Sequence, residues 1–400
     1  MSKCRICNGV NEQIINFGKI ALVGNFFKKS KNLKKYKISL NYCKKCKHVQ
    51  IREILNPDLL FRNYLWETGV SKSNMDLIDD LSKKIKKFQI KKESKVLEIA
   101  SNDGTLLSHF KEKFKCYVIG VDPAKNLENK KIFTVIDYFN LLLSKKIKKK
   151  FKTFDFIIAR NVIAHVSNPN EIFSGAHNLL TEKGVFIVEV PHLKNIIEQN
   201  QYDNIFHEHI GFHSLKSIID LSKKNNLKVF NVEKIDSQGG SIRCYICKKN
   251  YKRTILKKVK TMLDNEKKIG LFSPAKLKKF KFKIMEHISN LTNLIENLKK
   301  LKKNVSVYGA SGKGQALLQF CKLDNKKIDF VFDKSKLKEG SFTPGTNIKI
   351  LNPTMIKKIN PDFLLLLSWN LKKEILNQEK KFIKKGGKFI TPFPTPKIIK

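Results

Sequence analysis

The stretch YDNIFHEHIGFHS, residues 202–214, contains three histidines and one glutamate beside aromatic side chains. Imidazole and carboxylate groups bind metal ions, and a neutral imidazole is a suitable base near pH 7. The stretch is therefore a candidate metal site, a candidate catalytic base or a solvated loop. Its own residues, His207, Glu208, His209 and His213, do not decide among the three.

Four cysteines near the start of the chain form two Cys-x-x-Cys pairs, Cys4 with Cys7 and Cys43 with Cys46. Four thiolates at this spacing suit a tetrahedral, structural Zn²⁺ site, and a closed ligand set leaves no open position for catalysis. The alternative is free thiols or disulfides, and disulfides are rare in the cytosol. Residues 8–42 separate the pairs. This segment is longer than the loop of a typical zinc finger, so we expect it to have structure of its own.

Cys244 and Cys247 have the same spacing as a zinc knuckle, but they lie in SIRCYICK, which reads as a strand. An offset of three residues places two side chains on opposite faces of a strand. We therefore interpret these two cysteines as packing residues.

The segment VLEIASNDGTLL reads as a strand, a tight turn and a helix. The commoner nucleotide-binding turn has glycine where Ala100 and Asn102 stand, but Asn102 tolerates a positive φ and Gly104 keeps the last position. Asp122 ends the next strand, where an acidic side chain can hold both ribose hydroxyls. Together with Glu98 these residues favour a nucleotide-type ligand at the carboxyl edge of a sheet, and a generic α/β turn is the alternative.

A second glycine-rich turn, VYGASGKG at residues 307–314, also joins a strand to a helix. Its backbone N–H groups could bind phosphate, and Asp333 follows a strand near the ribose position. A Rossmann-like domain without a cofactor is an equal alternative. Between the two turns, residues 238–241 (QGGS) are most simply a turn between strands, although their open backbone could approach a ligand.

Apolar runs alternate with helical patterns through the middle of the chain, which indicates a doubly wound α/β sheet with buried strands. The strands are expected at residues 95–100, 117–122, 154–160 and 184–191. Residues 56–92 read as helical, and residues 251–302 read as long lysine-rich helices that lead to a second α/β unit.

We therefore expect three units. Residues 1–75 form the cysteine-containing module with a helical extension. Residues 76–250 form the first α/β unit and include the HEH stretch, and residues 251–400 form a helical linker and the second α/β unit.

The chain has 80 lysines and arginines against 35 acidic residues, a net charge of +45. Such a charge favours nucleic acid or an anionic membrane as partner, yet only six of the 80 are arginine, the residue that readers of nucleic acid prefer. The lysines are spread evenly, so we expect no specific nucleic-acid partner; an anionic small substrate is compatible with them.

The longest apolar run, FLLLLSW, is far shorter than a membrane span, and the first residues lack the apolar core of a signal peptide. We expect a cytoplasmic protein without membrane association, and a monomer.

The order of these motifs resembles the sugar C-methyltransferases that act on nucleotide-linked keto-deoxysugars. The resemblance covers nearly the whole chain: the paired cysteines, EIASNDG and NVIAHV, then HEH, GGSIR, YGASGKG and PGTNIKIL. It implies an α/β protein with an N-terminal zinc-binding module, a central class I methyltransferase Rossmann-like domain and a C-terminal second Rossmann-like domain. The implied cofactors are S-adenosylmethionine and Zn²⁺, and the implied substrate is a nucleotide-linked keto-sugar.

In that family the second histidine of HEH is the catalytic base, which is His209 here, with Glu208 beside it. Tyr64 and His165 correspond to residues that line the sugar pocket. Phe206 stands where a tyrosine is common, so the resemblance does not define the sugar or the methylated carbon. The motifs imply these cofactor-binding residues: Glu98, Ser101, Asn102, Asp103, Gly104, Asp122 and Asn161.

The implied reaction removes a proton from a carbon next to a ketone, and the enolate then attacks the sulfonium methyl. A neutral His209 would take the proton, His165 or Tyr64 could stabilise the enolate oxygen, and lysines near the cleft could hold the diphosphate. Two alternatives stay open. The basic charge favours an RNA methyltransferase with a zinc module, and the two nucleotide-type turns are compatible with a non-catalytic binding scaffold.

Overall fold

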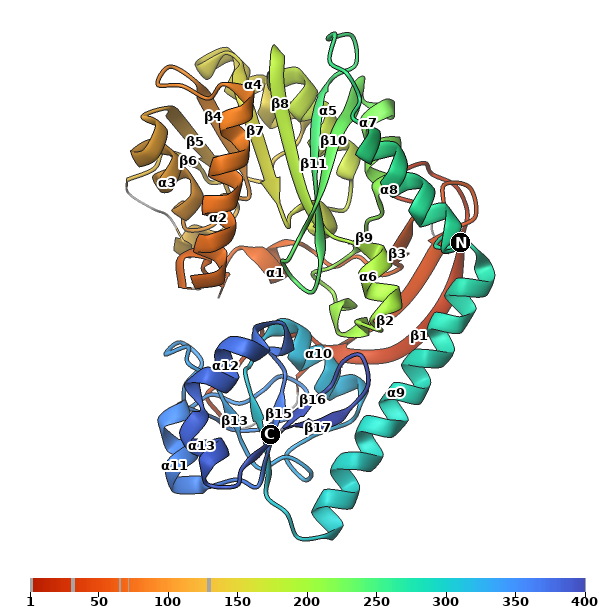
Figure 1. Ribbon diagram of the computed structural model, residues 1–400, viewed down its shortest axis with the longest axis vertical. Helices are drawn as coiled ribbons and strands as arrows, with labels where there is room; N and C mark the ends of the chain where they lie inside the picture. Colours follow the sequence, from red (N-terminus) through yellow and green to blue (C-terminus); the bar gives the residue numbers. More distant parts are fainter. Residues whose placement is uncertain (1–2, 30–32, 65, 71, 128–130, 400) are drawn as a thin grey trace.

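A computed structural model describes residues 3–29, 33–64, 66–70, 72–127 and 131–399. These residues form a four-stranded, a seven-stranded and a six-stranded sheet. Figure 1 shows the seven-stranded sheet in an upper lobe and the six-stranded sheet in a lower lobe. The strands of the four-stranded sheet lie at the side of both lobes. We call these the middle lobe, the C-terminal lobe and the N-terminal module. The fold class expected from the sequence is confirmed.

The N-terminal module is built on a long hairpin between the two cysteine pairs. β1 (Asn11–Ala21) pairs antiparallel with β2 (Lys35–Cys43), and β3 (Val49–Ile51) follows. The fourth strand, β9 (Gly211–Phe212), comes from the stretch that contains HEH and pairs with β3. The module therefore holds one end of the candidate catalytic stretch.

The sheet of the middle lobe has the order β10-β11-β8-β7-β4-β5-β6. Its pairs are parallel from β8 to β6, and β11 and β10 are added antiparallel at one edge. The strand order reverses between β4 and β7, and ligands of open sheets bind at the carboxyl ends of strands at such a point. The strands are β4 (Lys95–Ile99), β5 (Tyr117–Val121), β6 (Thr134–Val135), β7 (Phe154–Arg160), β8 (Leu180–Pro191), β10 (Leu227–Ile235) and β11 (Ser241–Lys248).

Helices cover both faces of this sheet, so its strands are buried on both sides. One hydrophobic cluster contains α2 (Lys72–Ile85) and α3 (Thr105–Phe114). The cluster on the other face contains α4 (Leu141–Phe151), α5 (Pro169–Leu179) and α7 (Leu215–Lys224). Cys244 lies in the second cluster and Cys247 in the first, which confirms that they are packing residues on opposite faces.

The helical segment expected over residues 56–92 is only partly confirmed. It consists of α1 (Asp58–Phe61), a 3₁₀ turn (Thr68–Val70), α2 and a second 3₁₀ turn (Lys86–Phe88). Between α1 and the first turn, the described residues are not helical. Side chains of the cofactor turn accept hydrogen bonds from the backbone N–H groups of Thr68 and Gly69, and these tertiary bonds compete with a continuous helix.

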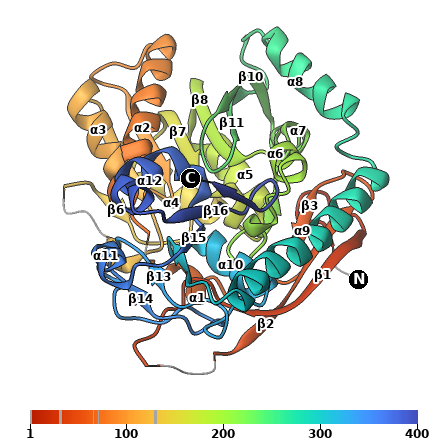
Figure 2. The ribbon, with the colours of Figure 1, turned by 60° about the horizontal axis from the view of Figure 1, so that its bottom comes forward.

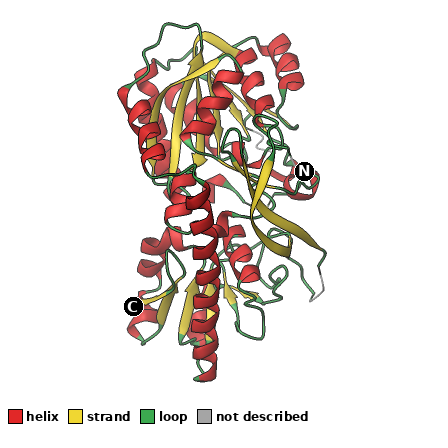
Figure 3. Cartoon of the chain, turned by 90° about the vertical axis from the view of Figure 1, so that its right-hand side faces the viewer, coloured by secondary structure: helices red, strands yellow, loops and turns green. Residues whose placement is uncertain are grey.

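The lysine-rich segment expected at residues 251–302 forms two helices, α8 (Lys257–Lys268) and α9 (Pro274–Lys300). α8 packs on the middle lobe, whereas α9 packs on β1 and on the C-terminal lobe. Figures 2 and 3 show α9 as the long connection that runs along the side of the molecule.

The sheet of the C-terminal lobe has the order β14-β13-β12-β15-β16-β17, parallel except for β17. Its strands are β12 (Val305–Tyr308), β13 (Val331–Phe332), β14 (Ile350–Leu351), β15 (Phe363–Leu366), β16 (Lys388–Thr391) and β17 (Lys397–Ile399). Its helices are α10 (Gly312–Phe320), α11 (Ile356–Ile359), α12 (Lys372–Gln378) and α13 (Lys380–Lys384).

In the part of the chain that the structure describes, no helix combines the length and the apolar composition needed to cross a membrane. The domain boundaries expected after residues 75 and 250 stay a prediction. α8, just after the second boundary, packs on the middle lobe, and β9 of the expected central unit pairs with β3 of the N-terminal module.

Arg243 in β11 joins three elements of the middle lobe and is fully buried. Its Nε donates to Glu189 Oε1 in β8 at 2.6 Å, and its Nη1 donates to Asp80 Oδ2 in α2 at 2.7 Å. Removal of one member of a buried ion pair leaves the other charge unpaired, which destabilises a protein strongly.

We therefore expect Arg243→Met to lower the free energy of unfolding of the middle lobe by about 3–5 kcal/mol. The control is Arg62→Met, because Arg62 pairs with the half-exposed Asp58 at 2.7 Å, and such surface pairs contribute at most about 1 kcal/mol. Urea unfolding measures both variants. Equal losses in the two would contradict the importance of burial at Arg243.

Candidate active site

The turn between β4 and α3 has the strained backbone of a nucleotide-binding turn although it has only one glycine. Ala100, Asn102 and Gly104 have φ angles of 58°, 54° and 70°. Asn102 and Gly104 tolerate this conformation, whereas alanine adopts it at a cost of about 1–2 kcal/mol. The turn therefore has the nucleotide-binding shape expected at Asn102 and Gly104, and Ala100 adopts a positive φ as well.

Asp122 holds this turn from the next strand. Its Oδ2 accepts from the backbone N–H of Asn102 and its Oδ1 from that of Ala124, each at 2.8 Å. Burial raises the pKa of Asp122, and the two backbone donors oppose this shift. Each carboxylate oxygen keeps a further lone pair, so the side chain can also accept from ribose hydroxyls.

Three predicted cofactor ligands have a buried polar atom without a hydrogen-bond partner among the described residues: Glu98 Oε2, Ser101 Oγ and Asn161 Oδ1. Glu98 and Ser101 lie at the carboxyl end of β4, and Asn161 follows β7. Burial raises the pKa of Glu98 to about 8, although Arg160 Nε lies 3.7 Å from its Oε1. Acceptors left open beside Asp122 fit the hydroxyl and ammonium groups of S-adenosylmethionine.

The side chains of Asn102 and Asp103 form hydrogen bonds with backbone groups of the protein. Asn102 Oδ1 accepts from Thr68 N at 2.9 Å, and Asp103 Oδ2 accepts from Gly69 N at 2.8 Å. These bonds fasten the segment after Tyr64 onto the cofactor turn. As direct cofactor ligands, the two side chains stay a prediction.

Tyr64 is fixed beside Glu208. Its backbone N–H and C=O bind the side-chain amide of Asn126 at 2.9 and 2.8 Å, and its hydroxyl donates to Glu208 Oε2 at 3.4 Å. Burial raises the pKa of Tyr64 well above its usual value and that of Glu208 to about 7. The pair therefore presents a protonated phenol and a carboxyl group that titrates near neutrality.

His209 is held as a single neutral tautomer. Its Nδ1 lies 3.0 Å from the backbone oxygen of Asn204, and a carbonyl only accepts, so Nδ1 carries the proton and Nε2 carries a lone pair. Burial lowers the pKa of His209 far below its usual value, and His165 and Lys313 add to this. The ring packs against Phe206 at 4.2 Å and edge-on to His165 at 4.8 Å between centroids.

The other two histidines of the stretch have structural partners. His207 Nε2 donates to the backbone oxygen of Lys37 in β2 at 3.1 Å, and His213 Nδ1 bonds Ser217 Oγ at 3.1 Å. Both residues are buried, whereas Glu208 and His209 are partly exposed, as are Tyr64 and His165. A substrate can therefore reach the residues of the predicted catalytic set but not His207 or His213.

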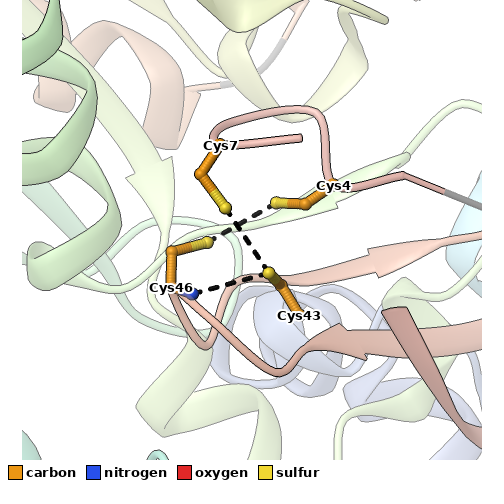
Figure 4. Close-up of side chains that lie close together, drawn as sticks. All are labelled: Cys4, Cys7, Cys43 and Cys46. Carbon is orange, nitrogen blue, oxygen red and sulfur yellow. Dashed lines mark hydrogen bonds between the residues drawn. The ribbon is translucent and has the colours of Figure 1, made fainter. Parts of the chain in front are cut away.

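The histidine stretch is not a metal site in the described structure. The one group of at least three His, Cys, Asp or Glu side chains there that could hold a metal is Cys4, Cys7, Cys43 and Cys46, whose Sγ atoms all lie within 4.8 Å of one another. Figure 4 shows the four sulfur atoms pointing toward a common centre. The hydrogen bond between Cys4 and Cys46 lowers the pKa of the Cys4 thiol to about 5 and raises the pKa of the Cys46 thiol.

The cysteine-containing module also contacts the HEH stretch. Arg5, between the first two cysteines, donates through Nη1 to the backbone oxygen of Ile210 at 2.8 Å, and Ile51 N donates to the same oxygen at 3.1 Å. Gly24 lies beside Glu208, because a Cβ there would be 3.8 Å from Oε1. The N-terminal module therefore fixes the backbone directly after His209.

The C-terminal lobe contributes Lys313, which sequence reasoning missed as a site residue. Its Nζ donates to the backbone oxygen of Gln238, in the turn between β10 and β11, at 2.9 Å. The signal in the sequence was YGASGKG, which we interpreted either as a phosphate-binding turn or as the turn of a Rossmann-like domain without a cofactor.

Three protein families match successive parts of the chain. Residues 4–61 match a family described as "Putative zinc binding domain", residues 67–232 match "Methyltransferase domain", and residues 236–394 match "C-methyltransferase C-terminal domain". The C-methyltransferase NovU of Streptomyces niveus is 30% identical over 410 residues, which span 100% of this chain and 97% of NovU. The chain belongs to this C-methyltransferase family. It is an S-adenosylmethionine-dependent C-methyltransferase with a zinc-binding module.

Solved structures similar to this C-methyltransferase cover about half of it. The mycolic acid cyclopropane synthase CmaA1, complexed with SAH and CTAB, is 14% identical to this chain, with a TM-score of 0.35. The match covers 49% of this chain and 92% of CmaA1. The PH0226 protein of Pyrococcus horikoshii OT3 is 18% identical, with 48% and 96% covered and a TM-score of 0.37.

We predict about one Zn²⁺ per chain of the C-methyltransferase, because four thiolates complete a tetrahedral site. Cys43→Ser should lose the metal and destabilise the N-terminal module, since ligand binding is coupled to local folding. Methyl transfer should fall with it, because this module holds the backbone after His209. Elemental analysis measures the zinc, and Cys116→Ser, a buried cysteine of the middle lobe, should keep it. Freshly purified, unchelated protein without zinc would reject the assignment.

Asp122→Ala should weaken S-adenosylmethionine binding about tenfold to thirtyfold, because it removes the acceptor for two hydroxyls at roughly 1 kcal/mol each. The matched control is Asp333→Ala. Asp333 holds the glycine-rich turn of the C-terminal lobe by the same pair of bonds, from Ala310 N at 2.6 Å and Ser335 N at 2.8 Å. Calorimetry should show unchanged cofactor affinity in the control. Parental affinity in Asp122→Ala would remove this residue from the site.

Proposed function

We propose that this C-methyltransferase methylates a carbon next to the ketone of a nucleotide-linked deoxysugar. The observation that carries the proposal is the state of His209: a neutral, partly exposed imidazole whose Nδ1 is bonded to the backbone oxygen of Asn204 and whose Nε2 keeps its lone pair. A carbon next to a ketone is acidic enough for such a base, whereas an unactivated carbon is not. The motif order that resembles the sugar C-methyltransferases supports the nucleotide-linked substrate.

The chain's own groups would perform the proton transfer. His209 Nε2 takes the proton from the carbon next to the ketone, and the C–H electron pair moves into the enolate, with negative charge on oxygen. S-adenosylmethionine, when bound, supplies an electrophilic methyl group on a sulfonium sulfur. Glu98, Asp122 and Asn161 would hold it at the edge of the sheet, and Tyr64 and Glu208 would bind sugar hydroxyls beside the base.

We place the diphosphate of the substrate at the glycine-rich turn of the C-terminal lobe. The N-terminus of α10 lies close to the HEH stretch, because a Cβ on Gly312 would be 3.3 Å from Val23 and 3.7 Å from the ring of Phe206. Lys338 Nζ donates to the backbone oxygen of Ala310 in the same turn at 3.0 Å. Backbone N–H groups at a helix N-terminus and a nearby lysine favour an anionic group.

The test of the function is mass spectrometry of the purified protein with S-adenosylmethionine and a panel of keto-sugar nucleotides. The expected product has gained one methyl group in place of one hydrogen. A panel of RNA substrates should gain none. Methylation of RNA without methylation of any sugar nucleotide would contradict the proposal.

His209→Asn should keep cofactor binding but lose both methyl transfer and the exchange of the substrate's α-proton with D₂O. One general base contributes about 10²–10⁴-fold to a rate, so exchange should fall by at least about a hundredfold. The control is His207→Asn, because His207 is buried against β2. NMR measures the exchange. If His207→Asn abolished it while His209→Asn left it intact, the assignment within HEH would be reversed.

A further inference from the structure

Lys313 of the C-terminal lobe places its ammonium group against the middle lobe, at the edge of the sheet where the cofactor is expected. The turn that it binds, at Gln238, precedes β11, whose first residue, Ser241, pairs with Pro191 at the carboxyl end of β8. This is the edge of the sheet at which Asp122 and Glu98 lie. The ammonium group is therefore positioned between the two lobes, where the substrate must meet the methyl donor.

The same lysine is an electrostatic neighbour of the base. Gly312, the residue before it, faces the ring of Phe206, and Phe206 packs on His209 at 4.2 Å between centroids. The charge of Lys313 is one of the causes that lower the pKa of His209.

No carboxylate of the described residues lies within 4.0 Å of Lys313 Nζ. Asp203 is the acid that acts on it electrostatically, but Asp203 is fully buried and its Oδ2 already accepts from Trp369 Nε1 at 2.7 Å. Burial lowers the pKa of Lys313 to about 8. A desolvated cation without a contacting anion is unfavourable, so an anion of the substrate is its expected partner.

Of the anionic groups of the substrate, the enolate is the one that forms beside His209, on which Lys313 acts electrostatically. The ketone oxygen is bonded to the carbon next to the one that loses its proton to His209 Nε2, so it must lie near the base. His165 and Tyr64 bring no positive charge to this oxygen, because burial lowers the pKa of His165 to about 4 and Tyr64 is a neutral phenol. His209 is also a weak base with its lowered pKa, so the reaction needs strong stabilisation of the enolate.

We propose that Lys313 is a catalytic residue whose ammonium group hydrogen-bonds the ketone oxygen and stabilises the enolate that His209 generates. Lys313 keeps its proton throughout. The C–H electron pair becomes the C=C bond, and the carbonyl π pair moves onto oxygen. When the carbon takes the methyl group from the sulfonium, the C=O bond forms again and the neutral thioether leaves, while the proton remains on His209 until it passes to solvent.

The proposal rests on the proposed function, and one experiment separates the two. α-Proton exchange with D₂O is followed by NMR on the keto-sugar nucleotide that is methylated fastest. Lys313→Met should lower the exchange rate about hundredfold, the effect of removing one oxyanion donor, while substrate KM and cofactor Kd change less than about threefold. Lys327→Met is the control, because Lys327 Nζ pairs with Glu296 Oε1 at 2.6 Å in the C-terminal half of the chain. The α-proton should exchange at the wild-type rate in this variant.

The double variant Lys313→Met, Asp203→Asn tests the structural alternative. If Lys313 only balanced the charge of Asp203, removal of both charges would restore exchange. We expect no restoration in a double variant that still binds S-adenosylmethionine. Restored exchange in the double variant, or exchange in Lys313→Met within a few-fold of the wild type, would overturn the role of Lys313. Neither result would contradict the proposed function. A wild type that neither exchanges nor methylates any keto-sugar nucleotide would overturn the proposed function, and this role with it.

Discussion

The hydrogen bond from His209 Nδ1 to the backbone oxygen of Asn204 is the interaction on which the site depends. It fixes the tautomer and leaves Nε2 as the acceptor, but it requires the chain on both sides to be rigid. Before the base, Asp203 is held by Trp369 of the C-terminal lobe. After the base, Ile210 is held by Arg5 of the cysteine knuckle. The zinc-binding module thus fixes the backbone next to the proposed base, and its closed ligand set leaves no open position for catalysis.

Each of the two Rossmann-like lobes has a strand-to-helix turn that is held by an aspartate in the same way. Asp122 and Asp333 each follow the second strand of a lobe and accept two backbone N–H groups in the same way. In the middle lobe, Glu98, Ser101 and Asn161 have buried polar atoms without a partner among the described residues, which fits a cofactor with hydroxyl and ammonium groups. In the C-terminal lobe, Lys338 lies 4.0 Å from Asp333 and lysines flank the turn, which favours anionic groups. A similar backbone therefore lies in opposite electrostatic environments in the two lobes.

The sequence predicted local features well because they depend on residue type and spacing. The cysteine pairs, the strands of the middle lobe and the opposite faces of Cys244 and Cys247 follow from such patterns. It did not predict that Ala100 has a positive φ, since alanine rarely does and only the surrounding bonds enforce it. It also missed β9 and Lys313, because a two-residue strand has no periodicity and no local pattern shows that residue 313 neighbours residue 209.

The tautomer and charge of His209 are the most direct test of this account. Nitrogen-15 NMR of histidine-labelled protein distinguishes a protonated from a bare ring nitrogen, and comparison with His209→Asn identifies the signals of this ring. The account predicts a neutral ring with the proton on Nδ1 and a bare Nε2, unchanged between about pH 6 and 8, where an ordinary histidine titrates. A doubly protonated ring in that range, or a proton on Nε2, would contradict it.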